Sequence, residues 1–343
     1  MLSAFATLSV FAILAVQAIP SPAATPCTGT IASLDDVDDA VKCTTVEIMS
    51  FTVPAGETFD LKLEDGTTVN MMGDVAFGNM TWEGPLFEIS GDNVVFNGNG
   101  HTFDGGGPFY WDGQGGNGGV TKPAPMMKIE ISGTFTNVRV LNSPERVYSV
   151  SNPGPLTMSN LTVDNSAGNA PNSKSDGQPA GHNTDGFDVS TTDLVIEDST
   201  VINQDDCLAI NKGSNIVFQR NTCMGGHGIS VAIRIKTDAT ATDASVTNVT
   251  YSGNTASQLR MFGVLIDQSY PDTLKTPGNG VQISDINFVG AENTFSVDSD
   301  ADRIAVNCGV GSCTGTWDWS ALTVTGGSAG PINNFTGIEG FSQ

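Results

Sequence analysis

Short apolar segments flanked by Asn or Asp recur along the middle of the chain. Asn137 and Asn160 begin two of them, and Asp193 and Asn215 begin two others at nearly the same interval. A period of about 20–30 residues built from short strands is typical of a solenoid, whereas the turns of a β-sandwich recur about every 8–12 residues. The pattern therefore predicts an all-β parallel β-helix with Asn and Asp at left-handed corner positions. The seven segments are Asn93-VVF-Asn97, Asn137-VRVL-Asn142, Asn160-LTV-Asp164, Asp193-LVIE-Asp198, Asn215-IVFQR-Asn221, Asn248-VTYSG-Asn254 and Asp285-INFV.

A second series of strand-like segments carries charged residues at similar intervals. Asp185 is followed after about one period by Asp205 and Asp206, and these are followed after about one more by His227. Side chains one coil apart on the same face of a β-helix lie about 5 Å apart. We therefore expect three carboxylates and one histidine to form a single patch. The segments are NTDGFDV (183–189), QDDCLAI (204–210), GHGISV (226–231), IRIKT (233–237) and FGVLIDQ (262–268).

Closely spaced carboxylates are typical of enzymes that cleave glycosidic bonds. One protonated carboxyl donates to the leaving oxygen while another activates water or attacks the sugar, and mutual repulsion keeps one of them protonated. Two other interpretations remain open: corner aspartates that only bond to turns, and a calcium site. His227, Arg234 and Lys236 beside the acids disfavour calcium, and the chain has no CxxC or HxxxH spacing, so no metal is expected.

Arg234 and Lys236 alternate with Ile233 and Ile235, which places both cations on one face of a strand. Beside an acidic patch, two cations with the same orientation indicate a site for a substrate carboxylate. A solvated strand face explains the spacing equally well. Tyr270 is a candidate to add a ring or hydroxyl group to the same cleft.

Composition and charge limit the classes of function. The 343 residues include 40 Gly, and 14 Lys and Arg stand against 37 Asp and Glu, which gives a formal net charge of −23. An acidic chain is a poor partner for nucleic acid or an anionic membrane. With 39% hydrophobic and only 15% charged residues, the chain is also not a disordered one.

The first residues predict secretion. An apolar run over residues 2–16 is followed by Val16-Gln17-Ala18, a small-residue cleavage pattern, although no Lys or Arg precedes the run. A membrane anchor is disfavoured because the run falls short of about 20 residues. We therefore expect a signal peptide over residues 1–18, or as far as about residue 24, and one catalytic domain over residues 19–343.

Cysteines and sequons fit an extracellular protein. An even number of cysteines in a secreted chain favours disulfides, and their order suggests three local bridges, although sequence alone does not fix connectivity. The pairs suggested are Cys27–Cys43, Cys207–Cys223 and Cys308–Cys313. Candidate N-glycosylation sites are Asn79, Asn160, Asn248 and Asn334.

The motifs NTDGFDV, QDDC, GHG and RIK, in this order, resemble those of fungal polygalacturonases, pectin-cleaving glycoside hydrolases with a right-handed parallel β-helix. The segments WEGPLF (82–87), WDGQGG (111–116) and CGVGSC (308–313) followed by WDW also resemble that family. The resemblance implies hydrolysis of α-1,4 bonds of polygalacturonate with inversion and without a cofactor. It matches Asp205 to the general acid, and Asp185 and Asp206 to the pair that holds the attacking water. It matches His227 to the histidine that supports the acid and the substrate. The residues matched to substrate binding are Asn183, Gln204, Arg234, Lys236 and Tyr270.

One spacing departs from the family. Arg234 follows closely after His227, whereas the family has another coil between GHG and RIK. The chain therefore lacks about one coil, on the order of 25 residues. One coil has one groove strand, so either GHGISV or IRIKT can occupy that position but not both. A splicing or gene-prediction error and a genuinely shortened family member would both explain the spacing.

Three functions remain open. The first is an endo-acting, monomeric polygalacturonase, and the second is an exo-acting or rhamnogalacturonan-cleaving relative. The third is an inactive β-helix that only binds cell-wall polysaccharide because the coil is missing.

Overall fold

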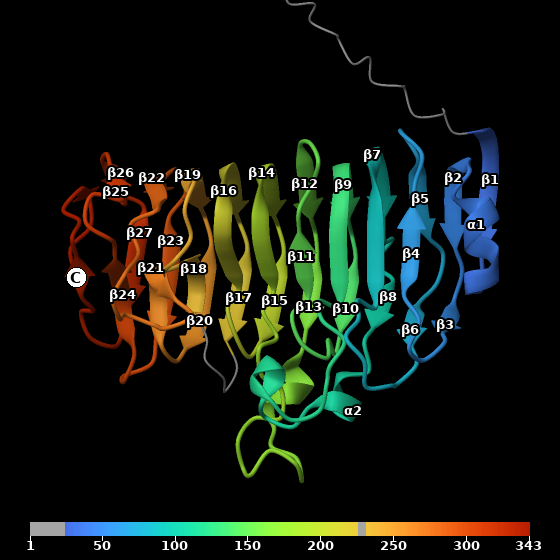
Figure 1. Cartoon of the computed structure of the whole chain (residues 1–343), viewed down its shortest axis with the longest axis horizontal. Helices are drawn as coiled ribbons and strands as arrows, with labels where there is room; N and C mark the ends of the chain where they lie inside the picture. The colour runs from blue at the N-terminus through green and yellow to red at the C-terminus, as the bar shows by residue number, and fades with distance from the viewer. Residues whose placement is uncertain (1–24, 226–230) are drawn as a thin grey trace, which may run out of the picture.

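A computed structural model describes residues 25–225 and 231–343. The expected signal peptide, residues 1–18 or as far as about 24, and His227 lie outside the described residues. Parallel strands form one 17-stranded and one 10-stranded sheet, with a further two-stranded pair. They stack along the long axis of the molecule, with the N-terminal α1 (Val37–Ala40) at one end (Figure 1). The expected parallel β-helix is confirmed.

Four long strands bend and join two ladders into the 17-stranded sheet: β7 (Phe87–Asn97), β9 (Met127–Thr136), β14 (Phe187–Glu197) and β16 (Leu208–Gln219). The first ladder, which we call the groove ladder, contains their first halves and β4 (Phe59–Lys62), β11 (Tyr148–Val150), β18 (Val231–Asp238), β21 (Phe262–Tyr270), β24 (Asp302–Asn307) and β28 (Ile332–Asn333). The second contains their other halves and β1 (Thr25–Ile31), β2 (Cys43–Ile48), β5 (Thr68–Met71), β12 (Leu156–Ser159), β19 (Ala244–Ser252), β22 (Val281–Phe288) and β25 (Cys313–Thr314).

The ten-stranded sheet forms the remaining face of the coil. It contains β3 (Phe51–Val53), β6 (Val75–Phe77), β8 (Thr102–Asp104), β10 (Arg139–Leu141), β13 (Thr162–Asp164), β15 (Thr200–Asn203), β17 (Thr222–Gly225), β20 (Thr255–Leu259), β23 (Asn293–Val297) and β27 (Leu322–Thr325). The two-stranded pair is β26 (Trp317–Asp318) with β29 (Ile338–Glu339), and the other helical turns are η1 (Leu34–Asp36), α2 (Gly107–Tyr110), η2 (Gly115–Asn117) and η3 (Ser166–Asn169). Within the described residues, no helix is long and apolar enough to cross a bilayer.

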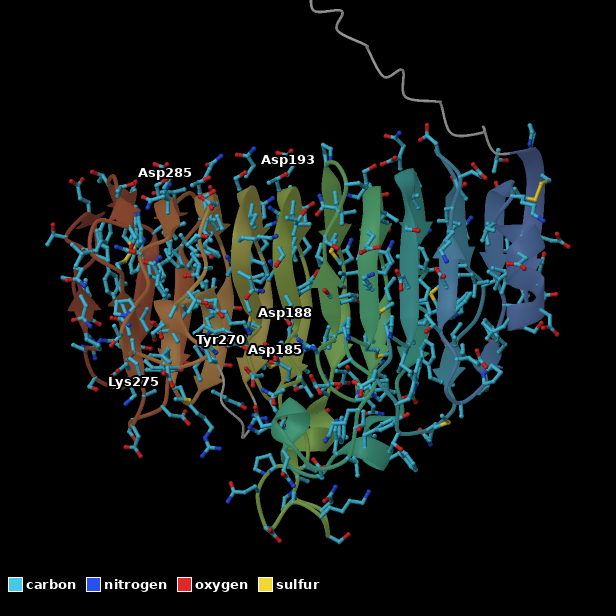
Figure 2. All side chains as sticks on the ribbon, viewed as in Figure 1. Asp185, Asp188, Asp193, Tyr270, Lys275 and Asp285 are labelled. Atoms are coloured by element: carbon cyan, nitrogen blue, oxygen red, sulfur yellow. A yellow bond between two sulfur atoms is a disulfide. The ribbon has the colours of Figure 1, made fainter. Side chains whose placement is uncertain are left out.

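The corner positions have the backbone that the repeat predicts. The Asn or Asp that begins each of the seven apolar segments has a φ between 52° and 57°, in the left-handed region that Asn and Asp tolerate. The corners also bond to one another, because Asn215 donates to Asp193 (2.9 Å) and Asn248 donates to Asn215 (2.7 Å). Asp193 and Asp285 lie along the same edge of the stack (Figure 2). Asn and Asp therefore form a ladder that runs from coil to coil along the stack.

The apolar segments belong to two faces, which the sequence pattern did not separate. Those that start at Asn137 and Asn160 become β10 and β13 of the ten-stranded sheet, whereas those that start at Asp193 and Asn215 lie in β14 and β16. Their intervals agree because each face recurs once per coil. The repeat thus measures the coil length and not a single strand position.

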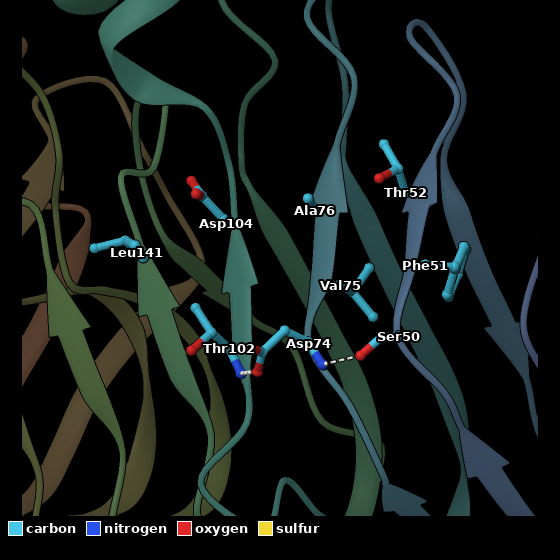
Figure 3. Close-up of a pocket in the computed structure, with 9 residues that line it drawn as sticks. All are labelled: Ser50, Phe51, Thr52, Asp74, Val75, Ala76, Thr102, Asp104 and Leu141. Atoms are coloured by element: carbon cyan, nitrogen blue, oxygen red, sulfur yellow. Dashed lines mark hydrogen bonds between the residues drawn. The ribbon is translucent and has the colours of Figure 1, made fainter.

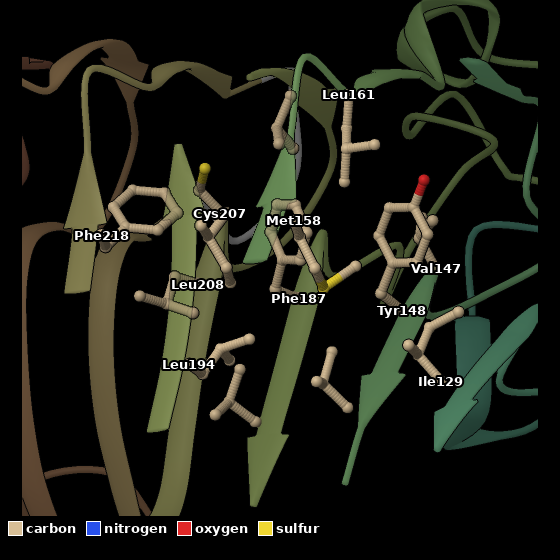
Figure 4. Packing of buried hydrophobic residues seen from close by; sticks show 14 of the residues in the cluster. Ile129, Val147, Tyr148, Met158, Leu161, Phe187, Leu194, Cys207, Leu208 and Phe218 are labelled. Atoms are coloured by element: carbon tan, nitrogen blue, oxygen red, sulfur yellow. The ribbon is translucent and has the colours of Figure 1, made fainter. Parts of the chain in front are cut away.

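Aromatic rings fill the interior between the faces. Phe187, Tyr148 and Phe218 are fully buried, and the rings of Phe187 and Tyr148 stack with centroids 5.1 Å apart (Figure 4). Apolar side chains in register on successive coils extend this core along the whole stack, since Phe187 pairs with Leu208, and Leu208 with Ile233. The core fixes where each groove strand starts.

The three expected disulfides are present: Cys27–Cys43, Cys207–Cys223 and Cys308–Cys313. Cys207 directly follows Asp206, so its bridge to Cys223 of β17 ties the acidic turn to the ten-stranded sheet. The four sequon residues Asn79, Asn160, Asn248 and Asn334 are all exposed. Their glycosylation stays a prediction.

Candidate active site

The turns that precede β14 and β16 carry the three expected carboxylates. Phe187 pairs with Leu208, so Asp185 and Asp206, each two positions earlier, occupy the same place on successive coils. Asp185, Asp205 and Asp206 are 3%, 5% and 0% exposed, and one oxygen from each lies within 4.8 Å of the others. The repeat therefore brings three carboxylates together, as predicted.

The next position in the groove ladder belongs to β18. Leu208 pairs with Ile233, so the residue one coil after Asp206 is Val231. The strand that carries RIK is therefore a direct neighbour of β16. Whether His227 reaches the carboxylates stays a prediction, because it lies outside the described residues.

Because β18 lies next to β16, Arg234 and Lys236 contact the carboxylates directly. Lys236 Nζ lies 3.2 Å from Asp185 Oδ2 and 3.3 Å from Asp206 Oδ2. Arg234 Nη1 lies 3.3 Å from Asp206 Oδ2. The two cations thus share one face, as the alternation with isoleucine predicted, and both form ion pairs there.

Asp205 forms none of the ion pairs found in the described residues. Its Oδ1 accepts a hydrogen bond from the backbone N–H of Asp206 (2.8 Å), and its Oδ2 accepts one from Asn183 Nδ2 (3.2 Å). Burial, reinforced by the charges of Asp185 and Asp206, raises the pKa of Asp205 well above its ordinary value. Asp205 is therefore the carboxyl of the three most suited to hold a proton.

Burial and neighbouring charges also shift the pKa values of Asp206 and Lys236. Burial raises the pKa of Asp206, and the charges of Arg234 and Lys236 oppose that rise. Burial alone would lower the pKa of Lys236, but Asp185 and Asp206 raise it. Lys236 is therefore held in its charged form.

Asp188 is a fourth acid that sequence reasoning missed. It points away from the core between Phe187 and Val189, 3.6 Å from Lys236 Nζ, and burial followed by repulsion from Asp185 raises its pKa to about 7. Figure 2 shows Asp188 near Asp185 on the same side of the ladder. The alternation of core and outward residues within NTDGFDV was the signal that could have identified it.

Gln204 does not line the cleft, contrary to the substrate-binding role that the resemblance implied. Its side chain is fully buried, with Nε2 donating to Asn165 O (2.7 Å) and Asn169 Oδ1 (2.8 Å) and Oε1 accepting from Thr184 (2.9 Å). Because these contacts occupy the amide, Gln204 instead anchors the loop that contains η3 to the acidic turn.

Asn183 and Tyr270 lie beside the carboxylates. Asn183 Oδ1 accepts hydrogen bonds from Gly116 N (3.1 Å) and Asn117 Nδ2 (3.2 Å), so the glycine-rich loop 115–119 orients the amide that bonds Asp205. The Tyr270 side chain is 41% exposed, and its ring centroid lies 5.8 Å from Lys236 Nζ. Both residues therefore border the carboxylate cluster and its cations.

Two of the hollows that lie outside the acidic cluster bear on where the chemistry takes place. One, of about 350 Å³, lies between the glycine-rich loop and Glu83, Glu145 and Arg146, next to Asn183. The other, of about 460 Å³, lies on the outer side of β3, β6, β8 and β10 (Figure 3). Its Asp74 is already bonded to Thr102 N (2.8 Å), and its lining contains no cluster of acids like that of residues 185–206. The chemistry is therefore expected at the carboxylates.

The three carboxyl groups place a proton donor and proton acceptors close together. Asp205 is placed to give a proton, while Asp185 and Asp206 can hold and deprotonate a water molecule. The same three carboxylates have the spacing of a cation site, but Lys236 and Arg234 already supply positive charge at Asp185 and Asp206. Acid–base hydrolysis is the chemistry that this geometry fits best.

Known proteins match this chain over most of its length. Residues 43–232 and 231–340 match the model of the family described as Glycosyl hydrolases family 28. The two matched segments meet at residues 231–232, close to the short spacing between GHG and RIK. Endopolygalacturonase A of Aspergillus flavus is 40% identical over 351 residues, and endopolygalacturonase B of Aspergillus oryzae is 39% identical over 350, with 92% of each chain covered in both cases.

A solved structure agrees with the sequence comparison. Endopolygalacturonase I from Stereum purpureum, complexed with two galacturonate, matches with a TM-score of 0.77 and 46% identity. The match covers 89% of this chain and 96% of that one. Fold and sequence therefore place the chain among the same relatives.

Proposed function

Because the chain belongs to glycosyl hydrolases family 28, we propose that it hydrolyses the α-1,4 bonds of polygalacturonate within the polymer. Its curated relatives are named endopolygalacturonases, and the Stereum purpureum relative was solved with two galacturonate. The observation that carries the proposal is the buried Asp205 next to two carboxylates paired with cations. Secretion, with cleavage of the N-terminal segment, is part of the proposal.

In the proposed mechanism, Asp205 protonates the glycosidic oxygen of the leaving unit. Asp185 and Asp206 accept a proton from a water molecule that attacks the anomeric carbon, so the C–O bond breaks as the new one forms. Asn183 bonds to Asp205 and orients its carboxyl group. No cofactor takes part in these steps.

Viscosity and reducing ends, measured together on polygalacturonate, test the proposal. We expect rapid loss of viscosity with few new ends, because cleavage within the chain shortens the polymer quickly. Release of ends with little thinning would instead indicate an exo-acting enzyme. Binding to the polymer with neither change would indicate the noncatalytic alternative.

Inversion of configuration is the finer part of the proposal and has its own test. The nearest carboxylate oxygens lie within 4.8 Å, whereas the two carboxyl groups of inverting enzymes are typically about 6.5–9.5 Å apart. If a water molecule nevertheless attacks directly, the first product from the α-linked polymer is the β-anomer. Proton NMR during the first minutes of reaction checks this, and an initial excess of the α-anomer would show retention.

A further inference from the structure

Lys236 and Arg234 occupy an unusual position for residues expected to bind a substrate carboxylate. The Lys236 ammonium group lies between Asp185 Oδ2 and Asp206 Oδ2, at 3.2 and 3.3 Å, and the Arg234 guanidinium group lies 3.3 Å from Asp206 Oδ2. The two side chains are only 13% and 12% exposed. A substrate carboxylate would have to compete for them with two buried carboxylates already in contact.

Only some of the clustered acids have a positively charged partner. Among the ion pairs of the described residues, Asp185 and Asp206 each have a cationic partner within 3.3 Å and Asp188 has Lys236 at 3.6 Å. Asp205 instead accepts hydrogen bonds from the backbone of Asp206 and the amide of Asn183. In the described part of the chain, Lys236, Arg234 and Arg146 are the cations within 4 Å of these four acids, and none of them pairs with Asp205. The acid without an ion pair is therefore the one that best accommodates a proton.

We propose that Lys236, with Arg234, is a positioning residue that serves as internal counter-ion to Asp185 and Asp206, so that these two are the bases and Asp205 is the proton donor. The inference deepens the proposed hydrolase function and rests on it. It follows from β18 lying directly beside β16, which brings both cations onto the carboxylates. Lys236 then acts through the acids and not by holding substrate.

Other charged groups lie around Lys236 and contribute to the charge balance of the cluster. Asp188 adds negative charge, and Arg146 Nε, 3.9 Å from Asp188 Oδ2 and 3.3 Å from Glu145 Oε1, balances part of it. Asp267, the register partner of Lys236 on β21, is bonded to Asn307 Nδ2 (2.9 Å) and Leu274 N (2.7 Å), while Tyr270 presents its ring. Lys236 is therefore the main cation at Asp185.

Kinetics of Lys236→Met against Lys275→Met test the proposal. Lys275 is an exposed lysine on the segment after β21 and serves as the matched control, since its side chain lies outside the acidic cluster. We expect Lys236→Met to reduce kcat by about 10-fold or more, with KM for polygalacturonate changed less than about threefold. The acid limb of kcat/KM should move up by about 1–3 pH units, because an opposite charge lowers a carboxyl pKa by that amount. Lys275→Met should keep the wild-type profile.

Thermal stability gives a second measurement that does not require activity. Burial already raises the pKa of Asp206, and Lys236 opposes that rise, so without Lys236 this folded-state pKa lies further above the unfolded value of about 3.9. Stability that is present below that pH is then lost as the pH rises. The decrease in Tm of Lys236→Met relative to wild type should therefore be larger at pH 7 than at pH 4. For Lys275→Met, any decrease should be the same at both pH values.

The outcomes separate this proposal from the proposed function. A large increase in KM with an unmoved acid limb and a Tm difference independent of pH would overturn the counter-ion role and restore substrate binding to Lys236. A wild-type chain without hydrolysis would refute the proposed function. In that case the pH dependence of the Tm difference alone would still support or overturn the ion pairing.

Discussion

Replacing Asp205 by Asn is expected to reduce turnover of polygalacturonate by about 10²–10⁴-fold, the usual contribution of a general acid. Asn keeps the shape of the side chain and an oxygen that can accept the backbone N–H of Asp206, but it has no proton to give to the leaving oxygen. Reducing-end release at saturating substrate measures the effect. Asp193→Asn at the far edge of the coil is the matched control and should retain wild-type turnover, since the Asp193 carboxylate bonds to Asn215 there.

Folding of Asp205→Asn is checked by its Tm as a function of pH. Burial and neighbouring charge raise the folded-state pKa of Asp205, so the stability that its protonated form contributes is present at low pH and is lost as the pH rises. Asn carries no such penalty, so the variant should gain stability relative to wild type as the pH rises from about 4 to about 7. Turnover within about threefold of wild type in this folded variant would remove Asp205 from the acid role.

Phe187→Ala should lower the free energy of unfolding by about 3–5 kcal/mol, because it leaves a cavity in a close-packed core. Phe187 is fully buried, and its ring stacks on Tyr148 with centroids 5.1 Å apart and faces Phe218. It also lies just after Asp185 in the chain, so collapse around the cavity is expected to move the acidic turn. Urea unfolding measures the first effect, and activity per folded molecule measures the second.

Phe96→Ala is the matched control for this variant. Phe96 is equally buried and stacks on Phe135 at 4.6 Å, but it lies on β7, away from the carboxylates. A similar loss of stability with unchanged activity is expected. If both variants retain full activity per folded molecule, the core beneath Asp185 does not position it.

Much of the fold was predictable because its determinants are local. A left-handed corner favours Asn, Asp or Gly through local sterics, so the seven corner residues could be identified one by one. The cysteine pairs are close in sequence, and the alternation of Arg234 and Lys236 with isoleucine fixes their common face.

The rest depended on quantities that the sequence does not contain. The interval used to place His227 assumed coils of constant length. The coil from Leu208 to Ile233 is longer than the preceding one, however, so Val231 is the residue one coil after Asp206. The position of His227, outside the described residues, stays a prediction. Gln204 looked like a cleft residue because it precedes two acids, but its amide turns inward to Asn165. Packing sets the direction in which the side chain of a turn residue points, and it also sets the length of each coil. The period of the sequence pattern reveals neither.

The register between β16 and β18 has a consequence for how such chains change over time. Every winding is held by hydrogen bonds to the windings before and after it, so the ladder closes again when one is removed. Removal of a coil would change which side chains meet across the junction, and at the β16–β18 junction of this chain a lysine and an arginine meet two aspartates. A single gene rearrangement can therefore exchange the neighbours of an acid in one step, with the rest of the molecule still able to fold.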